Sequence, residues 1–166
     1  MAVNRAKLGN KKYKQGNYLL QNSIKYIGQL PVKYRSSWEL AFCKFCDLNS
    51  RVVKWSAEFL EIPYQIVING QTENHRYYPD FYVEMTTENP DVYDKFVIEL
   101  KPNHELEPPT EPKRQSLKML ENFEYAQKMY RKNLYKWAFA RDWCERRGLK
   151  YKIITEEHLK KSGLIP

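Results

Sequence analysis

The chain has 166 residues, a hydrophobic fraction of 42% and a mean hydropathy of −0.75, values typical of one globular domain. No apolar run approaches the roughly 18 residues of a transmembrane helix, and no apolar stretch follows the basic N-terminus as a signal peptide requires. Three cysteines are too few for a disulfide scaffold and indicate a reducing compartment. These features argue against a membrane-spanning protein, a secreted disulfide-rich domain and a wholly disordered chain.

The net charge of +8 is unevenly distributed along the chain. Residues 1–35 carry 8 Lys and Arg and no acidic residue, whereas residues 36–112 carry 6 basic and 14 acidic side chains, a net of −8. Residues 113–152 carry 12 basic and 4 acidic side chains, a net of +8. An acidic middle between basic flanks suggests carboxylates that bind a metal and cations that bind a polyanion. The alternative is that these charges are ordinary solvated faces.

The N-terminal third of the sequence divides into a polar segment and the start of a domain. Residues 1–33 are basic and show no sustained apolar period, which predicts a flexible arm or an extended wrap before a single domain over residues 34–166. Ser36 is a typical helix N-cap, and the apolar spacing after it predicts a helix over residues 37–48. Cys43 and Cys46 on that helix are interpreted as small core residues rather than zinc ligands, because no second pair exists.

The middle and the end of the sequence predict strands, then helices, then a last strand. Strands are predicted at residues 52–55, 61–68, 76–85 and 93–101. The turn pair Asn69-Gly70 ends the second of these, and Pro79 requires an edge position or a bulge in the third. Helices are predicted at residues 113–132, 134–147 (ended by Gly148) and from Thr155, with a strand at residues 151–154 between the last two. This order predicts a mixed α/β domain with one central sheet.

Two short motifs on neighbouring predicted strands carry the chemistry. They are Tyr78-Pro79-Asp80-Phe81-Tyr82 and, further along, Glu99-Leu100-Lys101. Residues two apart on a strand face the same way, so Glu99 and Lys101 project together while Leu100 projects into the core. Asp80, Glu99 and the Leu100 carbonyl are hard oxygen ligands suited to Mg²⁺, for which Mn²⁺ can substitute. Lys101 can then position or deprotonate a water, or stabilise charge on a phosphate.

Each motif also has an ordinary structural interpretation. Glu-x-Lys is a common solvated pair, and Pro-Asp is a common turn signal. A third carboxylate, Glu39, follows Ser36 at capping-box spacing and can bond back to the helix start. A glutamate in the first turn can also face the sheet edge that carries the metal, so Glu39 is predicted to support the metal or the water.

The order Glu39, Pro79-Asp80 and Glu99-Leu100-Lys101 resembles the PD-(D/E)XK nucleases. A narrower resemblance, to the head completion nucleases of T-even-type tailed phages, is carried by Tyr34 to Leu40, His75 to Tyr82, Ile98 to Pro102, Lys136-Trp137, Ala140, Cys144, Arg147-Gly148 and Thr155-Glu156. It covers residues 34–157, most of the chain. A related motif around His75 occurs in the endonuclease subunit of cut-and-paste transposons.

The resemblance implies an αβββαβ core, with a central mixed sheet flanked by helices, and Mg²⁺-dependent hydrolysis of DNA phosphodiester bonds. It implies that Glu39, Asp80, Glu99 and Lys101 are catalytic. It further implies action on packaged double-stranded DNA before heads join tails, in the host cytoplasm or associated with the virion. Portal or head–tail connector proteins are implied partners, with no membrane and no nucleotide cofactor. The alternatives are a transposase or restriction-type endonuclease, and a non-catalytic virion assembly protein that binds DNA or the portal.

Basic residues near the carboxylates and in the last third of the chain are candidate DNA contacts. They are Arg35, His75, Arg76, Lys113, Arg114 and Lys118. The alternative for the first three is charge balance for the acidic segment. Aromatic residues are interleaved with basic ones over residues 113–152, and helical spacing predicts that most of these rings belong to the core.

Overall fold

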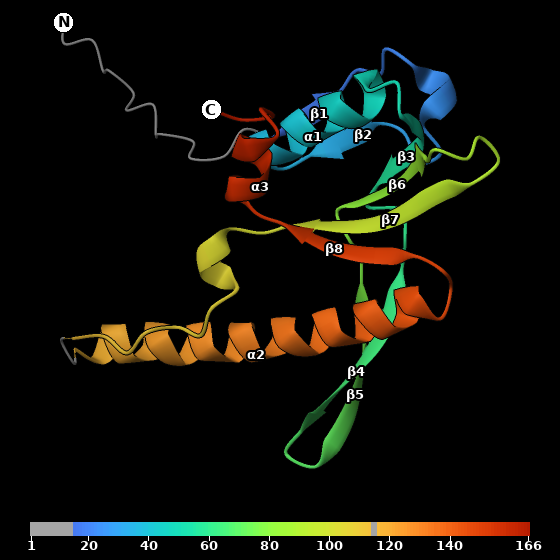
Figure 1. Ribbon diagram of the computed structural model, residues 1–166. Helices are drawn as coiled ribbons and strands as arrows, with labels where there is room; N and C mark the ends of the chain where they lie inside the picture. The colour runs from blue at the N-terminus through green and yellow to red at the C-terminus, as the bar shows by residue number, and fades with distance from the viewer. Residues whose placement is uncertain (1–14, 114–115) are drawn as a thin grey trace, which may run out of the picture.

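A four-stranded mixed sheet lies at the centre of the computed structural model, which describes residues 15–113 and 116–166 (Figure 1). In spatial order its strands are β3 (Val52–Ala57), β6 (Phe81–Thr86), β7 (Tyr93–Leu100) and β8 (Lys150–Ile154). The first three pair antiparallel, whereas β8 runs parallel to β7. A parallel pair needs a crossover connection, which here contains the long helix α2 (Leu117–Glu145). The predicted mixed α/β class with a central mixed sheet is confirmed.

The sheet separates two layers, each with its own core (Figure 1). One layer contains α1 (Ser37–Leu48), α3 (Glu156–Lys161) and a small sheet of β1 (Gly16–Tyr18) and β2 (Val32–Tyr34). The other contains α2 and a hairpin of β4 (Ile62–Ile68) and β5 (Gln71–Tyr77). Short 3₁₀ turns lie at Ser23–Lys25 and Asn103–Glu105. Strand β7 is covered on both faces, because Ile98 and Leu100 pack in the first core and Val97 packs in the second.

Helix α1 begins and ends as the sequence predicts. The Ser36 hydroxyl accepts a hydrogen bond from the Glu39 amide at 3.1 Å, which satisfies one of the free amides of the first turn. Phe42, Cys43 and Cys46 are buried on the face that packs against the sheet. Both cysteines therefore serve as core residues.

The described part of the predicted N-terminal arm, residues 15–33, packs on the domain. Tyr18 and Val32 are buried in the first core, and the buried carboxylate of Asp47 on α1 holds the chain between them. This carboxylate accepts hydrogen bonds from the Tyr18 hydroxyl at 2.9 Å and from the amides of Gln21 and Asn22 at 2.7 and 3.0 Å. The core thus includes residues before 34, in the form of an extended wrap. Residues 1–14 of the predicted arm lie outside the described residues.

The single strand predicted over residues 76–85 is wrong, because the chain forms two strands there. Strand β5 ends at Tyr77 and β6 begins at Phe81. Pro79 between them has no amide hydrogen to donate to a neighbouring strand, so a continuous ladder cannot pass through it. The break separates the hairpin from the central sheet.

The hairpin turn follows from its two residues. Asn69 and Gly70 both have positive φ, 50° and 75°, and they connect the directly paired Ile68 and Gln71. Two consecutive positive φ values define the type I′ turn, whose twist matches that of a two-residue hairpin. The turn predicted at Asn69-Gly70 is confirmed.

The two helices predicted over residues 113–132 and 134–147 are one helix, α2. It begins after Ser116, whose hydroxyl accepts from the Met119 amide at 3.4 Å, and it runs to Glu145 without an interruption. No glycine or proline lies within it, and Asn133 at the predicted break has only a modest helix penalty. In the described part of the chain, no helix is both long and apolar enough to cross a membrane.

Candidate active site

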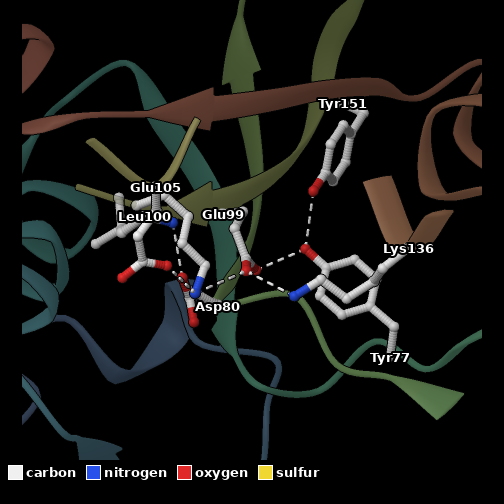
Figure 2. Close-up of polar contacts among 8 residues, drawn as sticks. Tyr77, Asp80, Glu99, Leu100, Glu105, Lys136 and Tyr151 are labelled. Carbon is white, nitrogen blue, oxygen red and sulfur yellow. Dashed lines mark hydrogen bonds and ion pairs between the residues drawn. The ribbon is translucent and has the colours of Figure 1, made fainter. Parts of the chain in front are cut away.

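Asp80 lies between β5 and β6, where the hairpin joins the central sheet. Glu58 lies between β3 and β4 and has a φ of 46°. Its amide donates a hydrogen bond to the Asp80 carbonyl at 3.0 Å. The break at Pro79 leaves the Asp80 side chain directed at the end of β7, where its carboxylate accepts from the Leu100 amide at 2.7 Å. Asp80 is therefore fixed beside the last residues of β7 (Figure 2).

Glu99 and Lys101 project from β7 on the side opposite Ile98 and Leu100, as their spacing predicts. Glu99 is only 4% exposed. The Lys101 ammonium lies 3.8 Å from a Glu99 carboxylate oxygen and 3.5 Å from that of Glu105. The structure therefore brings together three of the four predicted catalytic side chains, in one half-buried cluster.

The electrostatics of the cluster favour a cation. Burial, together with the negative charges of Glu99 and Glu39, raises the pKa of Asp80 to about 8. The Leu100 amide and the Lys101 charge act in the opposite direction but do not offset these effects. A carboxyl group that resists ionisation beside a second carboxylate is in an environment that a divalent cation would neutralise.

Three residues at the site were given no role by the sequence. Lys136 of α2 places its ammonium 3.2 Å from Glu99 and 4.6 Å from the centre of the Tyr77 ring. The Tyr77 hydroxyl donates to the other Glu99 oxygen at 2.6 Å, and the Tyr151 hydroxyl lies 2.9 Å from that of Tyr77 (Figure 2). Burial and the charge of Glu99 raise the pKa of Tyr77, so its hydroxyl stays protonated and donates.

These contacts hold both oxygens of Glu99 from two directions. The sequence contained a partial signal, because Lys136-Trp137 belongs to the family resemblance and Tyr77 precedes the Pro-Asp motif. Nothing in the spacing of these residues indicates that Lys136 meets Glu99 or that Tyr151 meets Tyr77.

Glu39 remains bound to the start of α1. Its carboxylate accepts from the Ser36 hydroxyl at 3.1 Å and from the Arg35 amide at 2.7 Å, so it closes the cap. Its charge nevertheless reaches Asp80 and raises the pKa of that group. The cap is thus observed, and the role of Glu39 at a metal stays a prediction.

Two of the predicted DNA contacts line one pocket with Lys136. Arg35 and Arg76 border a pocket of about 450 Å³ beside Tyr77 and Lys136. Both guanidinium groups are largely exposed, with ion pairs to Glu58 at 2.7 Å and Glu61 at 3.5 Å.

The other predicted contacts are scattered. His75 stacks on Tyr64 in the hairpin, with ring centres 5.3 Å apart. Lys113 and Lys118 are exposed before and in the first turn of α2. Lys118 lies about 27 Å along the helix axis from Lys136, so it does not join the carboxylate cluster. Arg114 lies outside the described residues.

The carboxylates at the site are too few to fill the coordination shell of a metal ion by themselves. Within residues 15–113 and 116–166, no group of three or more His, Cys, Asp and Glu side chains is arranged to hold a metal ion. The cluster offers two carboxylates, those of Asp80 and Glu99. Magnesium is commonly held by one or two carboxylates, with waters and substrate phosphates completing its shell, so this donor set fits it.

The central mixed sheet with helices on both faces agrees with a nuclease domain of the PD-(D/E)XK type. The chain belongs to this class: residues 49–156 match the family described as TnsA-like endonuclease N terminal. It is also 30% identical over 149 residues to the head completion nuclease of Enterobacteria phage T4, a match that covers 89% of this chain and 95% of that protein. The family range contains Asp80, Glu99, Lys101 and Lys136 but begins after Glu39.

Proposed function

We propose that this protein is a metal-dependent deoxyribonuclease that cuts packaged phage DNA during head completion, before heads join tails. The observation that carries the proposal is the meeting of Asp80, Glu99 and Lys101 at the end of β7. The order α1, β3, β6, β7, α2, β8, with the hairpin set aside, supports the αβββαβ core of the PD-(D/E)XK class. The similarity to the T4 head completion nuclease supports the place in phage assembly.

Asp80, Glu99 and the Leu100 carbonyl are the proposed ligands of Mg²⁺, with Mn²⁺ as a substitute. The N–H and C=O of one residue in an antiparallel pair face the same neighbouring strand. Because the Leu100 amide points at Asp80, its carbonyl faces the same side. A bound Mg²⁺ supplies Lewis-acid polarisation of a phosphate oxygen and lowers the pKa of a coordinated water.

The protein's own side chains orient the reactants. Lys101 lies between Glu99 and Glu105, where its ammonium can hold the attacking water and stabilise negative charge on the phosphate. Glu39 adds negative charge near Asp80 and so strengthens cation binding. Arg35 and Arg76 line the same pocket as Lys136, and their guanidinium groups can contact the phosphates of the DNA backbone.

Cleavage of supercoiled plasmid and linear duplex by the purified protein tests this proposal. We expect cutting with Mg²⁺ or Mn²⁺ and none with EDTA. A mock preparation from cells that carry the empty vector controls for contaminating nucleases. Loss of supercoiled plasmid shows cleavage without a free end. Absence of cutting with every metal would overturn the nuclease proposal and favour a DNA- or portal-binding assembly protein.

The same assay separates the second candidate, a transposase or restriction-type endonuclease, which the match to the TnsA-like endonuclease family favours. Such an enzyme cuts at a directed position, so end sequencing of the products would find one or a few sites. A head completion nuclease that trims packaged DNA is expected to leave dispersed ends.

Lys136→Met is expected to slow cleavage about tenfold, the usual cost of losing a residue that holds a metal ligand. Lys136 contacts Glu99 but lies on another element, so its role is to position that carboxylate. Lys136→Arg keeps the charge and should restore most of the rate. Arg141→Met, an exposed substitution on the same helix, is the control. An unchanged rate at saturating Mg²⁺ in Lys136→Met would contradict the positioning role.

A further inference from the structure

The half of α2 before Lys136 carries an exposed aromatic and basic face. Four residues on one side of the helix follow one another at spacings of three and four: Tyr125, Lys128, Lys132 and Tyr135. The same side of the helix carries Lys136, which contacts Glu99. Tyr125 is 66% exposed and Tyr135 is 47% exposed. The sequence predicted that most rings of this region belong to the core; Trp137 is buried, whereas Tyr125 and Tyr135 are exposed.

The hairpin forms the opposite wall of a groove along this face. Ile66, Val67 and Ile68 of β4 border a pocket of about 790 Å³ whose other side is formed by Tyr125 and Tyr135. The Val67 side chain is 60% exposed although it is apolar. The groove therefore joins apolar and aromatic surface that the fold itself does not cover.

The groove is positively charged. Lys128, Arg131 and Lys132 line it, and none of them forms an ion pair among the residues that the structure describes. The acidic residue in the lining, Glu73, is paired with His75 at 3.0 Å. This charge suits a negatively charged partner, and among such partners nucleic acid also offers bases to the exposed rings.

Two further pockets lie between the groove and the residues that contact Glu99. A second pocket, of about 500 Å³, shares His75 with the groove and Arg76 with the pocket beside Lys136. The three pockets therefore adjoin one another near His75 and Arg76 on β5. The pocket beside Lys136 is lined by Tyr77 and Lys136, which both contact Glu99.

We propose that this groove binds an unpaired DNA strand, with bases stacked on Tyr125 and Tyr135 and phosphates on Lys128, Arg131 and Lys132. The inference rests on the proposed nuclease function and specifies its substrate as DNA with a single-stranded part. Exposed rings interleaved with cations are the arrangement that binds single strands, because every unpaired base offers a face for stacking. In duplex DNA these faces are already covered by neighbouring bases, so the rings would have nothing to stack on.

Anisotropy of a labelled oligo(dT) of about 12 nucleotides tests the inference, within the usual range of single-strand site sizes. Binding is measured to the full chain in EDTA, beside a duplex of equal length. We expect Tyr125→Ala and Tyr135→Ala each to weaken oligo(dT) binding about tenfold and to leave duplex binding unchanged. Tyr93→Ala, which removes a similarly exposed ring (42%) from β7, should change neither. Circular dichroism confirms that each variant is folded.

Three results would overturn the inference. They are oligo(dT) binding that does not depend on the two rings, equal loss of duplex binding in both variants, and a wild-type dimer that becomes monomeric when the rings are removed. The last would assign the groove to a second copy of the chain. Plasmid cleavage is measured separately, so cutting without ring-dependent oligo(dT) binding refutes only the proposal that the groove binds a single strand. Ring-dependent binding without cutting refutes only the nuclease.

Discussion

Asp80→Ala and Lys101→Ala are each expected to lower the rate of DNA cleavage at least about a thousandfold, the cost of removing a group that stabilises a transition state or holds the metal. Asp80 is one of two carboxylates in the cluster, and its loss leaves Glu99 as the single acidic ligand. Lys101 and Lys136 both contact the Oε1 atom of Glu99, but among the described residues only Lys101 also pairs with Glu105, so Lys136 is not expected to replace it.

The measurement is single-turnover plasmid nicking at saturating Mg²⁺. Neither substitution removes a residue from the hydrophobic cores, so thermal melting and DNA affinity in EDTA should stay close to those of the wild type. Asp94→Ala and Lys160→Ala are matched controls, because Asp94 lies on β7 and pairs with Lys150 at the surface, whereas Lys160 lies on α3. Retained cleavage by Asp80→Ala or Lys101→Ala in metal-saturated buffer would contradict the assignment of the site.

Asp47→Ala is expected to lower the free energy of unfolding by about 3 kcal/mol or more. Asp47 is fully buried and accepts three hydrogen bonds from the segment that contains Tyr18, Gln21 and Asn22. Without the carboxylate the buried Tyr18 hydroxyl loses its acceptor, which costs about 1 to 3 kcal/mol, and the loss of the part-buried bonds from the Gln21 and Asn22 amides adds to this cost. Urea denaturation followed by tryptophan fluorescence measures the change.

An exposed ion pair serves as the control for Asp47. Asp142→Ala removes a carboxylate that pairs with Arg146 on the surface of α2, and it should cost less than about 1 kcal/mol. A loss of less than about 1 kcal/mol in Asp47→Ala would show that the wrap of residues 15–25 contributes little to the stability of the fold. The nuclease proposal does not depend on this result.

The local elements of the fold could be predicted from the sequence, because their signals lie within a few residues. Ser36 and the apolar spacing after it define α1, and Asn69-Gly70 defines the hairpin turn. The alternation on β7 predicts that Glu99 and Lys101 share a side, away from Ile98, and the structure confirms it. These features depend on backbone preferences and on the two-residue period of a strand.

The larger connections were predicted less well. The break between β5 and β6 depends on Pro79 and on Glu58, which lies in the bend between β3 and β4, so a pattern along one strand cannot place it. Helix α2 continues through Asn133 because no strong helix breaker interrupts it. Its exposed face shows that helical spacing of aromatic residues alone does not identify a core, since burial requires an opposing surface.

The sequence by itself determined the type and order of most elements and the residue types at the site, Asp80, Glu99 and Lys101. Only the tertiary structure decided what surrounds them. Lys136 meets Glu99 because α2 crosses back over the sheet, and Tyr151 meets Tyr77 because β8 follows α2 into place beside β7. Such contacts join residues that are far apart in the chain, so packing creates them and no local periodicity encodes them.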